Sequence, residues 1–229
     1  LGFALRGWDR IEDAQASCEE ARQHHPDSEE LLAQAASFAY EIRDLDKAVS
    51  LYQELLKLNP DNPIVQNDLA QSLASLGHHE DSERRFRALT ESFHYFTKPW
   101  LNIAIGKKFT ESDSDLKAML SISKDGALPS DQKMHLNFAL GKAFDDVKQF
   151  DRAFSFYRKG NQQYREQINF DAGSVKHYFD LIKHAFTVEE SERLRSFGAG
   201  NRKPIFILGM PRSGTSLTEQ ILSSHNNVF

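Results

Sequence analysis

Small and apolar residues recur at a fixed spacing along the first three quarters of the chain. Pro26 and Pro60 stand in similar settings, 34 residues apart. An alanine lies twelve residues before each proline, at Ala14 and Ala48, and Ser82 continues the series after another 34 residues. Such a period indicates a helical repeat architecture, in which one short unit stacks on the next.

Two further sets of positions follow the same period. Four residues after each small residue stand Cys18, Tyr52 and Phe86, and the preceding segments carry the pairs Leu1-Gly2, Ala35-Ala36 and Leu69-Ala70. Small residues let two helix backbones approach closely while larger side chains fill the groove beside them, so the pattern predicts two antiparallel helices per repeat. The proline ends each repeat because it lacks an N–H group and clashes with the preceding turn.

The later repeats are shifted in register. A clear copy occurs at Leu140-Gly141, Ala153 and Tyr157, three residues out of step, and a degenerate copy at Ile103-Ala104, Leu116 and Leu120 fills the interval before it. We place the three-residue insertion in the turn at residues 126–130, where glycine and proline disfavour a helix.

This pattern resembles the tetratricopeptide repeat (TPR). The resemblance covers residues 1–170 and implies about five repeats, of which the first is truncated and the fourth is degenerate. The tryptophan typical of the first helix is absent from every aligned position. The expected fold class is therefore mainly α, a TPR solenoid of helix hairpins, followed by the first β-strand, phosphate-binding loop (P-loop) and helix of an α/β domain.

The resemblance also implies a groove for a protein or peptide partner, lined by the first helix of each repeat. The expected lining residues are Glu30, Ala33, Tyr40, Asn67, Gln71, Leu101 and Lys108. They do not form the repeated Lys and Asn set that clamps a C-terminal carboxylate. The sequence therefore names no ligand, and a surface that is merely solvated or packed on a neighbouring domain is an equal alternative.

The last part of the chain differs in kind. Residues 171–202 predict a helical linker, and residues 205–208 then form a short apolar run typical of a buried parallel strand. Gly209 to Gly214 predicts a tight loop before a helix. Strand, glycine-bounded loop and helix together cradle an anion, because backbone N–H groups and the positive helix end converge on one point. Thr215 stands where a nucleoside triphosphatase has lysine, which disfavours a triphosphate ligand.

The run from Pro211 to Leu217 closely resembles the 5′-phosphosulfate loop of sulfotransferases, and helical repeats followed by this loop resemble the repeat-containing sulfotransferase family. The resemblance implies 3′-phosphoadenosine 5′-phosphosulfate (PAPS) as sulfuryl donor, without a metal. The implied donor-binding residues are Pro211, Arg212, Ser213, Gly214, Thr215 and Ser216. Loop amides and hydroxyl groups would hold the 5′-phosphate, and Arg212 would be catalytic, stabilising charge on the sulfuryl group and the bridging oxygen.

The implied enzyme passes a sulfuryl group from this donor to an acceptor hydroxyl, on a polypeptide or saccharide held partly by the repeats. In the family the acidic general base follows the position of Phe229, so we expect residues 203–229 to be only the start of the sulfotransferase domain and this chain alone to be inactive. Glu219 is not assigned as the base. The alternative function is a non-catalytic TPR scaffold for protein interactions.

Composition and charge exclude several other classes of protein and of site. Hydrophobic residues make up 40% and charged residues 27% of the chain, and the apolar run at 205–208 is far shorter than the roughly 20 residues of a membrane span. The net charge of −5 gives no bulk attraction to nucleic acid. Cys18 is the single cysteine, which excludes an intrachain disulfide and suits a reducing, cytoplasmic location. The adjacent histidine pairs splay apart, so no metal site is expected.

Overall fold

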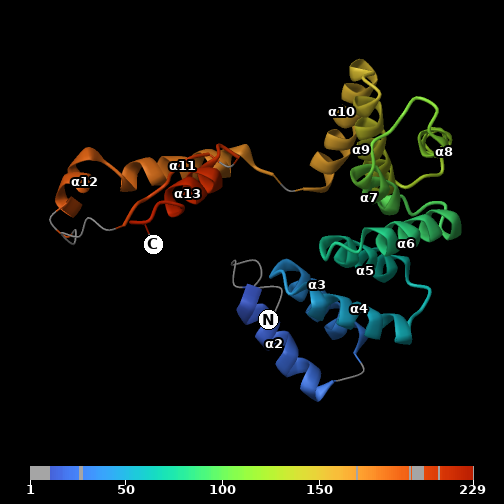
Figure 1. Cartoon of the computed structure of the whole chain (residues 1–229), viewed down its shortest axis with the longest axis horizontal. Coiled ribbons are helices and arrows are strands. Elements are labelled where there is room, and N and C mark those ends of the chain that lie inside the picture. Colours follow the sequence, from blue (N-terminus) through green and yellow to red (C-terminus); the bar gives the residue numbers. More distant parts are fainter. Residues whose placement is uncertain are drawn as a thin grey trace. The chain divides into compact units, whose positions relative to one another are not determined.

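The computed structural model describes residues 11–25, 28–168, 170–195, 197, 204–210 and 212–228. The chain divides into two compact units, Leu1–Phe170 and Asp171–Phe229. Within the described residues every regular element is a helix (Figure 1). The mainly helical fold predicted from the repeat pattern is therefore confirmed.

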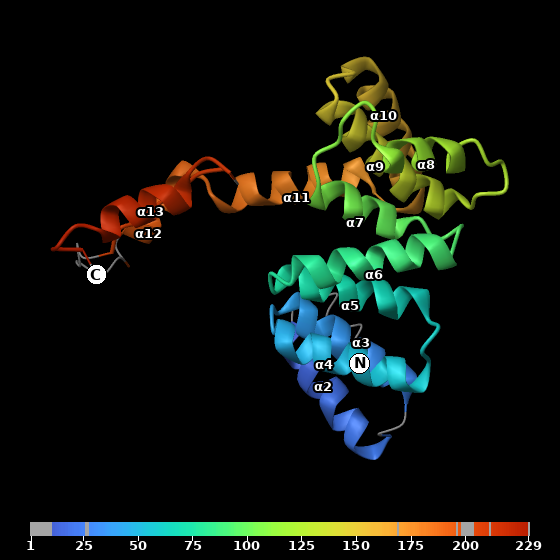
Figure 2. The same ribbon diagram turned by 45° about the vertical axis from the view of Figure 1, so that its right-hand side comes forward.

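The first unit is a succession of helix pairs. Its described helices are α2 (Ile11–His24), α3 (Glu29–Glu41), α4 (Leu45–Leu58), α5 (Pro63–Ser75), α6 (His79–Ser92), α7 (Lys98–Gly106), α8 (Ser114–Ile122), α9 (Ser130–Asp146) and α10 (Phe150–Gln167). Sequence neighbours pack together, most extensively α3 with α4, α5 with α6, and α9 with α10 (Figure 2). The starts of α3 and α5 lie 34 residues apart, as do those of α4 and α6.

Polar residues set where these helices begin. The Asn62 Oδ1 atom accepts hydrogen bonds from the N–H groups of Ile64 and Val65 at 3.1 and 3.2 Å, and Pro63 occupies the first helical position of α5. Asp44 caps α4 in the same manner through the Lys47 N–H group. Each cap satisfies an amide that has no partner inside its own helix.

The position that repeats along the second helices is buried in every described repeat. Ala14, Ala48, Ser82, Leu116 and Ala153 all have no more than 5% of their surface exposed. In each repeat this position lies on the second helix, so these residues occupy equivalent places in successive pairs. The periodic pattern therefore marks positions at which helices contact one another and not positions on the surface.

Gly141 shows most directly why one position must stay small. A Cβ atom placed there would lie 2.6 Å from Cδ1 of the Tyr157 ring, closer than real Cβ contacts. The aromatic ring of α10 thus rests directly on the backbone of α9. This contact explains why the small position of the last pair is a glycine when a tyrosine ring occupies the aromatic position opposite it.

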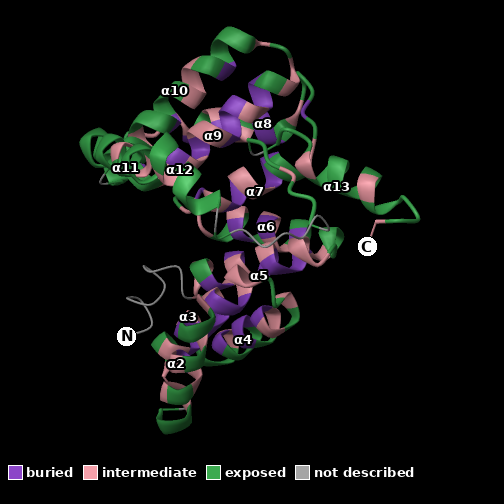
Figure 3. Ribbon diagram, turned by 90° about the vertical axis from the view of Figure 1, so that its left-hand side faces the viewer, coloured by how far each residue is buried: buried purple, intermediate pink, exposed green. Residues whose placement is uncertain are grey.

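Two buried clusters run through the first unit and meet at α5. Val65, Leu69 and Leu73 belong to the cluster of α2 to α5, whereas Ala70 belongs to the cluster that continues to α10. Buried positions accordingly extend from α2 to α10 in Figure 3. Since α5 contributes to both clusters, the pairs share one continuous interior.

The register shift falls at the connection between α8 and α9 and at the start of α9. Helix α9 begins eleven residues before Gly141, whereas α3 and α5 begin seven residues before Ala36 and Ala70. A turn at residues 123–129 does separate α8 from α9. The connection is also longer than its counterpart in an earlier repeat, since α8 ends at Ile122 and α9 begins at Ser130, whereas α4 ends at Leu58 and α5 begins at Pro63.

The second unit contains α11 (Ala172–Ala185), α12 (Val188–Arg195) and α13 (Thr215–Ser223). Residues 204–210, which include the predicted strand at 205–208, have no regular secondary structure here. A strand needs a hydrogen-bonded neighbour, and the described chain offers none. No described residue of this unit is buried.

None of the helices in the described ranges is long and apolar enough to cross a membrane.

Candidate functional site

The loop before α13 has an unusual backbone. The Ser213 N–H group donates to the Met210 carbonyl oxygen at 3.0 Å, which closes a tight turn. Arg212 has φ 66° and Gly214 has φ 91°, both in the left-handed region. Glycine adopts this region without strain, whereas a non-glycine residue there is uncommon and often marks a functional site. Gly214 is also the N-cap residue of α13, directly before its first residue, Thr215.

The loop folds back onto its first glycine. A Cβ atom on Gly209 would collide with the Ser213 Oγ atom and would lie 3.0 Å from Cγ2 of Thr215. A side chain at Gly209 would therefore force the Ser213 and Thr215 side chains to shift. The glycine spacing recognised in the sequence thus has a steric reason in the structure.

Four of the expected donor-binding residues lie together. Arg212, Gly214, Thr215 and Ser216 line a shallow hollow of about 350 Å³ at the start of α13. The first amides of a helix have no partner in their own helix, and the helix dipole places partial positive charge there. An exposed guanidinium beside such amides is an arrangement that can hold an anion.

The other expected residues are placed differently. Pro211 lies outside the described residues. The Ser213 hydroxyl contacts Gly209 and does not line the hollow. Thr218 does not line the hollow, but its N–H and Oγ1 groups both donate to the Gly214 carbonyl oxygen, at 2.9 and 3.1 Å, and so fix the first turn of α13.

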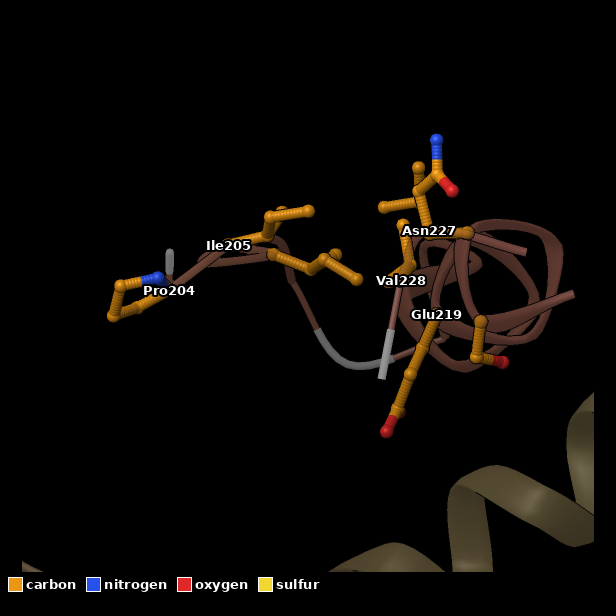
Figure 4. A pocket seen from close by; sticks show the side chains of 8 residues that line it. Pro204, Ile205, Glu219, Asn227 and Val228 are labelled. Atoms are coloured by element: carbon orange, nitrogen blue, oxygen red, sulfur yellow. The ribbon is translucent and has the colours of Figure 1, made fainter. Parts of the chain in front are cut away.

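A cavity larger than this hollow lies elsewhere in the second unit. It has a volume of about 690 Å³, and Figure 4 shows Pro204 and Ile205 on one side with Glu219, Asn227 and Val228 on the other. The residues that line this cavity are mainly apolar, so its volume alone does not make it the candidate catalytic site. Glu219 lines this cavity and not the hollow at Arg212.

The first helices of the repeats are linked by polar side chains. Gln71 Nε2 of α5 donates to the Tyr40 hydroxyl of α3 at 3.3 Å, and the same hydroxyl lies 3.3 Å from Ser75 Oγ. Further along, Lys98 of α7 forms a 2.9 Å ion pair with Asp68 of α5. Much of the polarity on this face is thus already engaged between repeats.

Two of the expected groove residues need correction. Asn67 is fully buried, and its Oδ1 accepts a 3.0 Å hydrogen bond from Asn102 Nδ2, so it joins α5 to α7 instead of facing a ligand. Lys108 lies beyond the end of α7. A one-dimensional period cannot distinguish a polar residue that faces solvent from one that bonds to the next repeat.

An ionic cluster joins α6 to α8. Asp115 has 7% of its surface exposed, and it accepts hydrogen bonds from Lys107 Nζ at 2.7 Å and from both terminal nitrogens of Arg87 at 3.2 and 3.3 Å. Burial opposes ionisation, but the hydrogen bonds from Lys107 and Arg87 outweigh it and lower the pKa of Asp115.

Comparisons with known proteins match the two units of the chain to two different family models. Residues 39–94 match the family model described as tetratricopeptide repeat, and residues 204–229 match the model described as sulfotransferase family. An uncharacterised protein of Aquifex aeolicus (strain VF5) is 36% identical over 121 residues. That match spans 53% of this chain and 16% of the relative, so the chain covers only a small part of the relative's length.

Solved structures resemble the chain in fold. A thermophilic TPR protein of Thermus thermophilus aligns with a TM-score of 0.54 at 16% identity, covering 71% of this chain and 87% of that protein. MamA of Desulfovibrio magneticus RS-1, from residue 41 to its end, aligns with a TM-score of 0.50 at 15% identity, covering 72% of this chain and 92% of that one. The helix pairs of this chain therefore form a tetratricopeptide solenoid.

Proposed function

We propose that the loop from Gly209 to Ser216 binds the 5′-phosphosulfate end of PAPS, and that the chain carries this site for sulfuryl transfer to an acceptor hydroxyl. The observation that carries the proposal is the closed loop itself. Gly209 is packed beneath Ser213 and Thr215, and Arg212 lines a hollow at the start of α13. The short match to the sulfotransferase family model falls on the same residues and supports the proposal.

The loop residues would divide the work between binding and catalysis. Amides at the start of α13, with the hydroxyl groups of Thr215 and Ser216, suit the 5′-phosphate because they offer several donors to one anion. During transfer the acceptor hydroxyl gives its proton to a general base, to which no residue of this chain is assigned, and its oxygen forms a bond to sulfur while the bond from sulfur to the bridging oxygen breaks. The 5′-phosphate leaves with the added negative charge, and Arg212 stabilises that charge.

The solenoid has a separate role in this proposal. Its continuous interior and fixed helix pairs provide a rigid surface, which is the usual basis of protein or peptide recognition by repeat proteins. We assign it the recruitment of a polypeptide partner. This role would stand alone, as a non-catalytic interaction scaffold, should the loop bind no nucleotide.

Calorimetric titration with adenosine 3′,5′-bisphosphate tests the loop. Binding should be saturable in the 229-residue chain, and Gly209→Val should abolish it because the added side chain shifts those of Ser213 and Thr215. Arg212→Ala should weaken it by about tenfold, the size of one charge-assisted hydrogen bond. Arg195→Ala removes an exposed cation from α12 and serves as the matched control.

Unchanged affinity in Gly209→Val would contradict the assigned loop. A loss in Arg195→Ala equal to that in Arg212→Ala would show that only overall charge matters. If adenosine 3′,5′-bisphosphate fails to bind the unsubstituted chain, the scaffold function becomes the better description.

A further inference from the structure

A second cavity lies in the last helix pair of the solenoid, between the turn that follows α8 and the helices α9 and α10. It has a volume of about 290 Å³. Two lysines line it, Lys133 on α9 and Lys159 on α10, together with the side-chain amides of Asn137 and Gln163. The cavity belongs wholly to the first unit and is independent of the loop at Gly209.

The floor of this cavity is apolar and fixed. Leu128 and Leu136 are 2% and 1% exposed, so they belong to the interior of the solenoid. Phe156 completes the floor, and its ring stacks on Phe144 at a centroid distance of 5.5 Å. Apolar surface in such a cavity favours a ligand with an apolar group of matching size.

The rim of the cavity is cationic. No carboxylate lines it, and neither lysine forms an ion pair with a carboxylate of the described chain. Lys159 Nζ lies 5.3 Å from the centroid of the Phe156 ring, which places its charge beside the apolar floor. The nearby acid Asp125 accepts from the Ala127 N–H group, and Asp131 accepts from Gln132.

An internal hydrogen bond orders the polar wall. Asn137 Nδ2 donates to Gln163 Oε1 at 2.8 Å, which ties α9 to α10 and leaves the amide nitrogen of Gln163 as a donor. Donors and cations therefore predominate around the rim. A cavity near 300 Å³ lies at the small end of ligand sites, enough for a group of about one amino-acid residue.

We propose that this cavity binds a carboxylate carried on a compact apolar group, with the carboxylate at Lys133 and Lys159 and the apolar group on Phe156, Leu128 and Leu136. A free amino-acid-sized acid and the last residue of a polypeptide both present this chemistry. The site adds a binding function to the solenoid at a place that the repeat pattern does not mark.

Titration of the 229-residue chain with N-acetyl-leucine and with N-acetyl-leucinamide tests the proposal. The acid should bind at least about tenfold more tightly than the amide, because only the acid pairs with the lysines. Lys133→Gln and Lys159→Gln should each weaken binding of the acid by about tenfold. Lys57→Gln, on the exposed surface of α4, removes the same charge elsewhere and should leave the affinity unchanged.

Two further ligands identify the source of the carboxylate. If the peptide acetyl-Gly-Ser-Gly-Leu binds more tightly than N-acetyl-leucine, the polypeptide end is the preferred form, and equal affinities identify the free acid as sufficient. Equal binding of inorganic phosphate would overturn the proposal, because the apolar floor would contribute nothing. Equal binding of acid and amide, an equal loss in Lys57→Gln, or no saturation by the acid at about 10 mM would overturn it as well.

Discussion

The two units of the chain use apolar residues in opposite ways. In the solenoid, Leu140 is completely buried between α9 and its neighbours, whereas Leu208 in the second unit is 90% exposed. The solenoid helices share a continuous interior, and no described residue of the second unit is buried. The contrast separates stability from recognition: packing maintains the first unit, and local backbone geometry shapes the loop of the second.

The same substitution should therefore have very different effects in the two units. Leu140→Ala should lower the free energy of unfolding by about 2–5 kcal/mol, because it leaves a cavity in a closed interior. Leu208→Ala should change it by less than about 0.5 kcal/mol. Urea unfolding followed by circular dichroism measures both, and comparable losses would contradict the contrast.

Gly141→Ala tests the closest approach within the solenoid. The new Cβ atom would meet the Tyr157 ring at 2.6 Å, so overpacking should outweigh the gain in helix propensity and cost about 1–2 kcal/mol. In a Tyr157→Ala background the ring is gone, and the same change should stabilise the chain by about 1 kcal/mol. The sign should thus reverse between the two backgrounds in thermal or urea unfolding. A stabilising Gly141→Ala in the native background would show that the ring yields freely.

The ionic cluster between α6 and α8 gives a pH-dependent prediction. Asp115→Asn should destabilise the solenoid by about 1–2 kcal/mol at pH 7, a value reduced because the Arg87 side chain is 41% exposed. The pKa of Asp115 is lowered in the folded state, so its stabilisation is present above the unfolded pKa of about 3.9 and is lost as the pH falls through the folded pKa. The difference between native and variant chains should shrink as the pH falls below about 4. A constant difference over this range would exclude ionisation of Asp115 as its source.

Removing a helix-capping side chain should have a smaller effect on stability than the substitutions above, and the effect should again differ between the two units. Asn62→Ala should cost about 1 kcal/mol of solenoid stability through the loss of the cap of α5. Asp171 caps α11 in the second unit, accepting from the Gly173 and Ser174 N–H groups at 2.9 Å. Asp171→Ala should reduce helix content by circular dichroism and leave the unfolding midpoint of the solenoid unchanged. A shifted midpoint would show that α11 contributes to solenoid stability.

The sequence predicted the structure correctly at positions where steric constraints allow only one kind of residue. The period of Ala14, Ala48 and Ser82 predicted buried contacts, because only small side chains fit where two helices meet. Gly209 and Gly214 were likewise visible, since each occupies a position that a larger residue would disturb. These features depend on local geometry that the chain encodes directly.

Sequence reasoning failed where partners lie far away in the sequence. Asn67 reads as a groove residue, although Asn102 binds it across the repeat boundary. The cavity between α9 and α10 escaped notice for the same reason, because Lys133 and Lys159 come together only when the two helices pack.

Amide chemical shifts provide the most direct test of the phosphosulfate loop. Titration of the ¹⁵N-labelled chain with adenosine 3′,5′-bisphosphate should shift the amides of Gly214, Thr215 and Ser216 and leave those of the solenoid helices unchanged. Saturable shifts confined to residues 209–218 are the predicted result. An unshifted loop at ligand concentrations of several millimolar, about the weakest range that such a titration detects, would contradict it.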